Sequence, residues 1–256
     1  MRSSGHMLAL DGTLIPEHIN VAVVGAGPAG LGVARVLRDL GICDVWVLER
    51  GNIGQSFLNW PRDTQLLTPS FPGNVFGITD LNAISFDSSP GWSLKSEHPS
   101  GHEYAAYLDQ AAKSFGLNVQ CNIEVIGLEP EGDWFNLYTD NGDLQANFVI
   151  WACGQFGTPS DGAITGAVHG RHYASVDKWS EMPGENAFVV GGYESGIDAA
   201  IGLARAGKSV TDFDVDAPWN DKDPSRTLSP FTHQRFREAM KGGKITLQGD
   251  EEIVAL

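Results

Sequence analysis

The chain has 256 residues, which is enough for two domains of ordinary size. It carries 32 acidic against 17 basic side chains, giving a formal net charge of −15. This balance excludes nucleic acids and anionic membrane surfaces as expected partners, because neutralising phosphate groups requires a basic face.

The N-terminal part of the chain leads into a glycine-rich motif. Residues 1–7 resemble a cloning remnant and are set apart from the fold. The β-branched run Val21–Val24 then passes into Gly25, Gly27 and Gly30, spaced G-x-G-x-x-G. In this motif the first glycine permits a tight turn and the second lets the backbone approach a pyrophosphate. The third lets a helix pack closely against the strand.

A helix and a second strand complete the motif. Residues 31–40 have the apolar spacing of a helix, and Gly41 lies where a helix C-cap belongs. The strand Val45–Leu48 ends on Glu49, whose carboxylate suits the hydroxyls of a ribose. The unit predicts a dinucleotide site with the phosphates at the start of the helix. The alternative is a glycine-rich turn in an unrelated α/β domain.

The residues after Glu49 form a loop of small polar residues with two aromatic ones, Phe57 and Trp60. Its place directly after the ribose acid favours a loop that folds over a cofactor. The alternative is a surface loop in which the two rings pack locally. Residues 62–96 are rich in Pro, Gly, Ser and Asp, which indicates a long irregular segment, and such segments are often functional.

The middle of the chain predicts one helix and several short strands. The helix covers residues 101–115 and is closed by Gly116. Three strands follow, over residues 122–128, 133–139 and 143–146. The sequence Asp-Asn-Gly at residues 140–142 is a hairpin signal. The continuous apolar run Phe148–Trp151 predicts a buried parallel strand.

The opening pattern is repeated after a linker at residues 155–170. A strand ending at Val190 leads into a second glycine turn, a helix over residues 197–206 and a strand over residues 209–213, which Asp214 follows. The turn consists of Gly191, Gly192, Tyr193, Glu194, Ser195 and Gly196. Its middle glycine is replaced by tyrosine, which narrows the expected approach of the backbone to a phosphate.

Two such units predict an α/β fold of two Rossmann-like dinucleotide-binding domains with parallel sheets and a β-meander. The first domain is expected over residues 8–155 and the second over residues 156–256. Two nucleotide sites imply two cofactors, or one cofactor and one nucleotide substrate. Hydride transfer from a nicotinamide to a flavin is the chemistry that needs such a pair.

These motifs resemble the two-dinucleotide-binding-domain flavoproteins, in particular the flavin-containing monooxygenase-like branch. Residues 54–61 (GQSFLNWP) and 189–200 (VVGGYESGIDAA) are similar to bacillithiol-disulfide-reductase-like and cation-efflux-associated flavoproteins. The resemblance covers residues 20–256 almost continuously. It implies FAD on the first unit, NADPH or NADH on the second, and hydride transfer to the flavin. The electrons would then pass to a small acceptor such as a disulfide or O2.

The resemblance also implies which residues face the cofactors. Those expected at FAD are Gly25, Gly27, Pro28, Ala29, Gly30, Glu49, Arg50, Gln55, Ser56, Phe57, Trp60, Val125, Ala152, Cys153 and Gly154. Those expected at the nicotinamide dinucleotide are Gly191, Gly192, Tyr193, Glu194, Ser195 and Gly196. Among them, Val125 would meet the adenine through its backbone, and Cys153 replaces the threonine of the family's Ala-Thr-Gly hinge.

The chain departs from the family pattern in three places. Ala29 stands where the bacillithiol reductases have a cysteine, and His169 and His172 do not meet the monooxygenase pattern F-x-G-x-x-x-H. The family also continues beyond Leu256 to a Gly-Asp motif at the flavin, which predicts a shortened form, or an FAD site completed by a partner segment or a second copy. Three hypotheses follow: a reductase, a monooxygenase of a small substrate, and a catalytically inactive nucleotide-binding module.

Reactive side chains are few. The three cysteines, Cys43, Cys121 and Cys153, form no C-x-x-C motif and no metal-ligand cluster, and no apolar run reaches membrane-spanning length. We therefore expect a cytoplasmic protein that binds no metal and no membrane and acts on a small molecule. No protein side chain is assigned as acid, base or nucleophile, since the flavin and the nicotinamide carry the reactive atoms.

The choice between NADH and NADPH stays open at this point. Asp214 favours a free 2′-hydroxyl and hence NADH, whereas Lys222 and Arg226 in the following loop, and the family resemblance, favour NADPH. The basic side chains Arg235 and Arg237 fall in a helical stretch and are predicted to line a solvated face.

Overall fold

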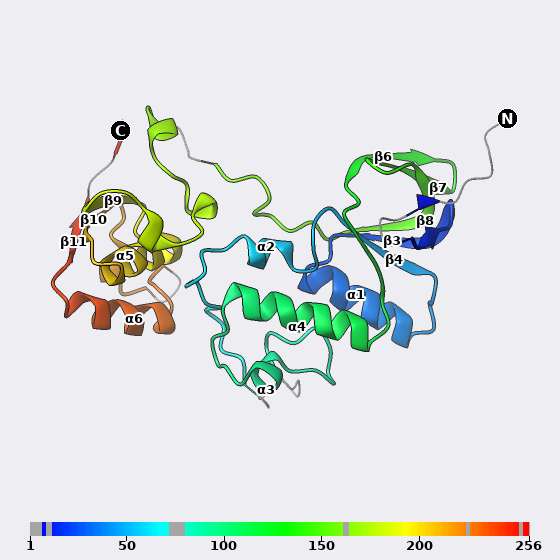
Figure 1. The fold of residues 1–256 in the computed structure, drawn as a ribbon, viewed down its shortest axis with the longest axis horizontal. Helices are drawn as coiled ribbons and strands as arrows, with labels where there is room; N and C mark the ends of the chain where they lie inside the picture. The colour runs from blue at the N-terminus through cyan, green and yellow to red at the C-terminus, as the bar shows by residue number, and fades with distance from the viewer. Residues whose placement is uncertain are drawn as a thin grey trace. The chain divides into compact units, whose positions relative to one another are not determined.

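The computed structural model describes residues 7–8, 12–71, 80–160, 164–223, 226–250 and 253–255. The predicted cloning remnant lies outside these residues, apart from Met7. The chain forms two compact units (Figure 1). Unit 1 contains the described residues up to Leu58 and Thr68–Thr158, and unit 2 contains Asn59–Leu67 and the described residues from Pro159 onward. The sequence indicates one division after residue 155, whereas the structure also groups residues 59–67 with the later part of the chain.

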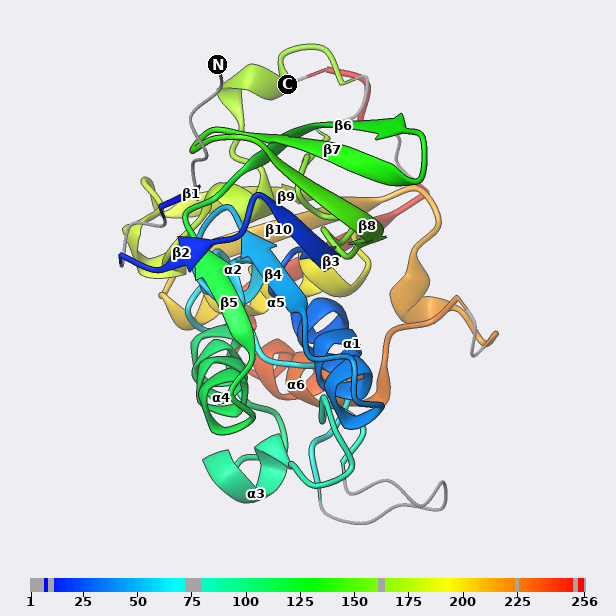
Figure 2. The same ribbon diagram turned by 90° about the vertical axis from the view of Figure 1, so that its right-hand side faces the viewer.

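Unit 1 is built on a six-stranded sheet with the strand order β5-β4-β3-β8-β7-β6 (Figure 2). Its strands are β3 (His18–Val24), β4 (Val45–Glu49), β5 (Asn118–Cys121), β6 (Val125–Glu131), β7 (Trp134–Thr139) and β8 (Leu144–Trp151). The strands β5, β4, β3 and β8 run parallel, and β7 and β6 are added antiparallel as a meander. A short hairpin of β1 (Met7–Leu8) and β2 (Leu14–Ile15) precedes the sheet.

Two predicted strands turn out to be one. The sequence predicts a meander strand at residues 143–146 and a separate closing strand at 148–151, but β8 is continuous through both. Its early residues pair with β7, and its length pairs with β3, so a single strand joins the meander to the parallel sheet. The prediction that this strand is buried is wrong for Phe148 and Trp151, whose side chains are exposed.

The helices of unit 1 are α1 (Pro28–Asp39), α2 (Gln55–Leu58), α3 (Pro90–Leu94) and α4 (Gly101–Ser114). The start of α4 is fixed by a capping box, in which the Ser100 hydroxyl accepts the N–H of Glu103 and the Glu103 carboxylate accepts the N–H of Ser100. In α1, Leu31 and Ala34 are buried, whereas Leu40, the last residue of the predicted helix, lies beyond α1 with 72% exposure. Buried side chains that form the core of unit 1 include Ile15, Ile19, Leu48, Ile123, Leu137 and Leu144.

Unit 2 has a parallel three-stranded sheet with the strand order β11-β10-β9. Its strands are β9 (Asn186–Val190), β10 (Ser209–Asp214) and β11 (Ile245–Gly249), and its helices are α5 (Glu194–Arg205) and α6 (Pro230–Met240). Its short 3-10 helices are η1 (Ala167–His169), η2 (Tyr173–Ser175), η3 (Trp179–Glu181) and η4 (Pro218–Asn220). Ile197, Val210 and Phe236 belong to one buried cluster that joins α5, α6 and the sheet. The other face of β9 is open, with Phe188 exposed by 72%.

Candidate functional site

The first glycine turn connects β3 to α1 and fits the geometry that the sequence predicts. Gly25 has a φ of +109°, and a Cβ there would lie 2.5 Å from the carbonyl oxygen of Ala152. A Cβ on Gly30 would overlap the carbonyl oxygen of Gly25. Glycine is therefore required at both positions, at one for the turn and at the other for the close approach of helix and strand.

The start of α1 offers room and free donors to an anion. Gly27 is the N-cap of the helix, no side chain caps the first turn, and a Cβ on Gly27 would meet nothing within 4 Å. Ala29, in the first turn, is exposed. Uncapped backbone N–H groups and the positive end of the helix dipole suit a phosphate. The first turn therefore fits the pyrophosphate of a dinucleotide.

Glu49 lies beside this turn at the end of β4. Its Oε2 accepts a hydrogen bond from the N–H of Ala26 at 2.8 Å, and its Oε1 accepts one from the N–H of Gly51 at 2.9 Å. These bonds hold a buried carboxylate between the glycine turn and the loop that follows β4. That is where an acid meets the ribose of a bound dinucleotide.

Three further segments of unit 1 border the first turn. The N–H of Gly54 donates to the carbonyl of Ala26 at 3.0 Å, and the N–H of Ala152 donates to the carbonyl of Val24 at 2.8 Å. The N–H of Ile123 donates to the carbonyl of Glu49 at 2.9 Å, which brings the segment before Val125 to the end of β4. The structure thus gathers around one turn the loop after Glu49, the Ala152 segment and the meander edge.

The remaining residues expected at FAD divide between the two units. In α2, Gln55 accepts hydrogen bonds from Asn52, and Phe57 packs edge-to-face on Tyr104 with ring centroids 4.8 Å apart. Ser56 and Arg50 are exposed beside these residues in the chain. Trp60 belongs to unit 2.

The second glycine turn, between β9 and α5, repeats the first. Gly191 has a φ of +103°, and a Cβ on Gly196 would overlap the carbonyl oxygen of Gly191. The N–H of Gly191 donates to Phe213 at 2.8 Å, as that of Gly25 donates to Leu48 at 2.8 Å. No side chain caps α5. The second turn therefore also fits a pyrophosphate.

Tyr193 replaces the middle glycine without straining the backbone. Its φ of −85° and ψ of −161° are extended values, and they match the φ of −83° and ψ of −177° of Gly27 in the first turn. The Tyr193 side chain is exposed by 49%, and its hydroxyl donates to the carbonyl of Thr227 at 3.4 Å. Any L-residue can adopt this conformation, so the second turn keeps its shape.

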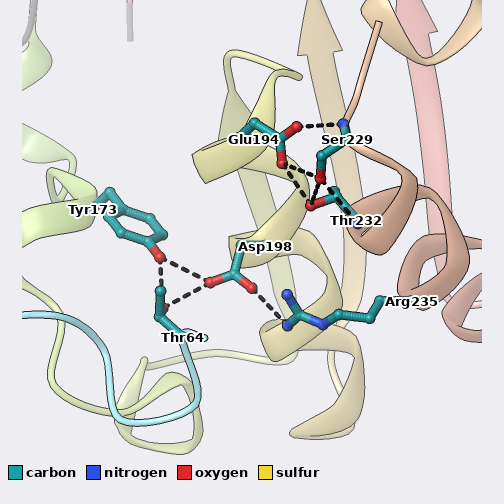
Figure 3. Close-up of polar contacts among 7 residues, drawn as sticks. All are labelled: Thr64, Tyr173, Glu194, Asp198, Ser229, Thr232 and Arg235. Carbon is teal, nitrogen blue, oxygen red and sulfur yellow. Dashed lines mark hydrogen bonds and ion pairs between the residues drawn. The ribbon is translucent and has the colours of Figure 1, made fainter. Parts of the chain in front are cut away.

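A polar network fixes α5 to the elements around it (Figure 3). Near its start, the Glu194 carboxylate accepts the N–H of Ser229 at 2.5 Å and the hydroxyl of Thr232 at 2.5 Å. One turn later, Asp198 accepts hydrogen bonds from Thr64 at 2.7 Å and Tyr173 at 2.8 Å. Figure 3 shows that Glu194 and Asp198 project from successive turns of α5.

The buried end of this network corrects a prediction. Arg235 was expected on a solvated face, but its side chain is only 8% exposed and lies 2.6 Å from Asp198. Burial beside Asp198 also raises the pKa of Tyr173, which keeps its hydroxyl protonated as a donor. A buried ion pair of this kind needs both partners, since either charge alone would be costly.

Asp212 is a buried acid that the sequence analysis missed. It lies on β10 with no exposed surface, and neither carboxylate oxygen has a hydrogen-bond partner among the described residues. Burial, together with the nearby charge of Asp214, raises the pKa of Asp212 to about 8. The sequence does hold a signal for this burial: Val210, Asp212 and Asp214 alternate along one strand, so their side chains lie on the same face.

The cysteines offer no redox pair or metal site in the described part of the chain. Cys43, Cys121 and Cys153 form no disulfide, and no group of three or more acidic, histidine or cysteine side chains there could hold a metal. Burial of the thiol and the charge of Glu49 raise the pKa of Cys153, which lowers its thiolate fraction. Across the described residues, every helix is too short or too polar to cross a bilayer.

Comparison with known families decides which kind of protein carries this pair of turns. Residues 22–256 match the family described as pyridine nucleotide-disulphide oxidoreductase. The chain belongs to this family. Membership confirms the predicted α/β Rossmann-type fold and the resemblance to flavin-containing monooxygenases and bacillithiol disulfide reductases. FAD with NADH or NADPH are the cofactors of this group of flavoproteins.

Individual relatives give the same picture at lower similarity. A Baeyer-Villiger monooxygenase of Streptomyces coelicolor is 30% identical over 226 residues, covering 84% of this chain and 41% of that protein. An oxidoreductase of Geobacillus kaustophilus called CzcO-like is 29% identical over 197 residues, covering 74% of this chain and 53% of that protein. The chain thus spans about half the length of these curated relatives.

A solved structure shares the fold. The bacillithiol disulfide reductase Bdr (YpdA) of Staphylococcus aureus superposes with a TM-score of 0.75 at 22% identity, over 93% of this chain and 68% of that one. At this identity the similarity shows the fold alone.

Proposed function

We propose that this chain carries the nucleotide-binding part of an FAD-dependent oxidoreductase that takes hydride from NADH or NADPH. The observation that supports it best is the repeated turn: two uncapped helix starts, each with its glycine geometry, in a chain that belongs to the pyridine nucleotide-disulphide oxidoreductases. One turn would hold FAD and the other the nicotinamide dinucleotide.

The roles of the residues follow from their places around each turn. In unit 1, the N–H groups at the start of α1 would bind the FAD pyrophosphate, Glu49 would bind the adenosine ribose, and Ala152–Gly154 would border the cofactor. The Gln55–Phe57 segment and Trp60 would lie along the flavin, and Val125 would meet the adenine. In unit 2, residues 191–196 would bind the pyrophosphate of the nicotinamide dinucleotide. These assignments rest on the contacts above and on the family resemblance.

The flavin, when bound, supplies the redox centre. It would accept two electrons and one proton as hydride from the nicotinamide and, with one proton from solvent, deliver two electrons and two protons to a two-electron acceptor. The chain's own contribution is to bind and orient the two cofactors. We propose a small-molecule acceptor. A cytoplasmic location fits three cysteines that form no disulfide, since thiols persist in a reducing compartment.

Two observations favour a monooxygenase over a disulfide reductase as the finer assignment. Ala29 offers no thiol in the first turn, and the raised pKa of Cys153 makes it a poor nucleophile. The relative that is 30% identical bears the name of a Baeyer-Villiger monooxygenase. One oxygen atom of O2 would then be inserted into the substrate, and the other would be reduced to water. Oxygen consumption that depends on an added ketone, one O2 per nicotinamide oxidised, distinguishes this activity from reduction of an added disulfide.

The test of the proposal is an absorbance measurement. Protein purified and saturated with FAD should show the two visible flavin bands and lose the longer-wavelength band anaerobically when NADH or NADPH is added. Folded, flavin-saturated protein whose spectrum does not change with either nucleotide would contradict hydride transfer. Colourless protein that still binds a nicotinamide nucleotide by calorimetry would instead support the inactive module.

A further inference from the structure

The end of β10 presents a fixed carboxylate next to the second glycine turn. The Oδ2 atom of Asp214 accepts the N–H of Gly192 at 2.6 Å, and its Oδ1 atom accepts the N–H groups of Asp216 at 2.8 Å and Ala217 at 3.1 Å. Glu49 is held in the same way in unit 1, by the N–H of Ala26 in its own turn. An acid at this place accepts hydrogen bonds from the ribose hydroxyls of an adenosine.

A second carboxylate lies close to Asp214 in the chain. Asp216 is exposed two residues after it. Of the ion pairs found among the described residues, none includes Asp214 or Asp216. The 2′-phosphate of NADPH carries up to two negative charges, and sites that accept it place an arginine here.

Of the two cations named in the sequence, Lys222 is exposed in the loop after β10, and Arg226 faces another acid. The Nε atom of Arg226 lies 3.9 Å from Asp221, within the loop that follows β10. Val215, which directly follows Asp214, is apolar and exposed by 56%. The residue at the same place in unit 1 is Arg50. The position directly after the strand acid is therefore held by valine in unit 2, where unit 1 has a cation.

An aromatic ring forms the wall of this region. A Cβ on Gly192 would overlap the indole of Trp219, and one on Gly249 would lie 3.7 Å from the same ring. The indole therefore extends from the second glycine turn to the end of β11, with Asp214 beside it. Gly192 is required to make room for Trp219. A flat apolar wall suits a purine ring and offers no charge to a phosphate.

We propose that the second glycine turn selects NADH over NADPH, with Asp214 as the specificity-determining residue. The inference rests on the proposed function, because it names the dinucleotide that the second turn binds. Asp214 binds the free 2′-hydroxyl of NADH and repels the 2′-phosphate of NADPH at contact distance. A like-charge contact of this kind suppresses binding of the wrong partner.

The test compares NAD+ and NADP+ binding to the full chain, loaded with FAD, by isothermal titration calorimetry. NAD+ should bind at least about tenfold more tightly than NADP+. Asp214→Asn, which removes the charge and keeps an acceptor, should weaken NAD+ and reduce this ratio severalfold. Val215→Arg, at an exposed site with Asp214 intact, should strengthen NADP+ binding. Glu185→Gln, which removes one charge at the opposite end of the sheet, should leave the ratio unchanged.

The outcomes separate the two proposals. Equal or tighter binding of NADP+ would overturn the selectivity and leave the dinucleotide site in place. An unchanged ratio in folded Asp214→Asn and Val215→Arg protein would overturn the role of Asp214. Binding of neither nucleotide would overturn both the selectivity and the second site. Binding of NAD+ by a protein whose flavin NADH does not bleach anaerobically would overturn hydride transfer alone.

Discussion

The two glycine turns share a backbone and differ in what surrounds it. Gly25 and Gly191 have φ values of +109° and +103°, and in each turn the strand acid bonds the residue after the first glycine. Behind the turns the side chains diverge. Asp198 on α5 stands where α1 has Gly32, by alignment of the two motifs. The backbone is therefore set by the phosphate-binding turn, and the side chains by the packing that each unit requires.

A second difference lies inside the sheets. Val47 and Asp212 occupy the same place in β4 and β10, two residues before the terminal acid, and both have no exposed surface. The valine packs as an ordinary core residue, whereas the aspartate has no hydrogen-bond partner among the described residues. An unpaired buried carboxyl is costly, so unit 2 carries a penalty that unit 1 avoids.

The largest expected effect tests whether the glycines do the same work in both turns. Gly30→Ala and Gly196→Ala each place a methyl group on the carbonyl oxygen of the first glycine in the same turn. Each should therefore destabilise its unit by about 3 kcal/mol or more. Gly27→Ala, whose methyl would enter open space, should leave stability within about 0.5 kcal/mol and weaken FAD binding. Urea unfolding and FAD retention measure the two effects. Equal stability of Gly27→Ala and Gly30→Ala would contradict the close approach.

The second effect sharpens the difference between Gly32 and Asp198. Asp198→Ala leaves Arg235 buried without its ion-pair partner and should lower the free energy of unfolding by about 3–5 kcal/mol. The matched control is Asp177→Ala, which breaks an exposed ion pair with Arg62 and should cost less than about 1 kcal/mol. Denaturant titration of both variants measures the costs. Similar losses would show that burial adds nothing to the Asp198 pair.

The third effect depends on pH and concerns Asp212. The folded state holds its proton up to about pH 8, whereas the unfolded chain releases it near the ordinary value of 3.8. The folded state therefore binds more protons between these values, and this contribution to stability falls as pH rises, by at most about 1.4 kcal/mol per pH unit.

Asp212→Asn provides the control for that slope, since an amide does not titrate. Urea midpoints measured from pH 5 to pH 8 should fall more steeply for the native chain than for the variant. Asp212→Val, which copies Val47, should lose the excess slope as well. Parallel curves for all three proteins would contradict the raised pKa.

Local signals allowed the glycine turns, α1, α4 and the strand acids to be predicted from the sequence. Each depends on residues within a few positions of one another, such as Gly25 and Gly30. Long-range packing explains the failures. Arg235 is buried because Asp198 lies 37 residues away in sequence and faces it in space. The β5 strand was missed because Asn118–Cys121 alternates polar and apolar residues over only four positions.

The meander was predicted in parts for a similar reason. The sequence of residues 143–151 does not indicate that a single strand, β8, pairs antiparallel with β7 and parallel with β3. That pairing depends on where β3 and β7 lie in the fold. The roles of Trp219 and Gly192 were likewise hidden, because the contact joins a turn to a residue 27 positions later. The sequence predicted the turns, and the structure was needed for the residues that enclose them.

The central claim, that each turn binds its own nucleotide, is tested by one matched pair of charges. Ala29 and Ser195 are exposed at the same place in the first turns of α1 and α5. A glutamate there suits the helix dipole, so it should not destabilise the fold, but it would repel a pyrophosphate. Binding of FAD and NAD+ is measured on both variants by calorimetry. We predict that Ala29→Glu loses FAD and keeps NAD+, and that Ser195→Glu loses NAD+ and keeps FAD; unchanged binding of both nucleotides in either folded variant would contradict the account.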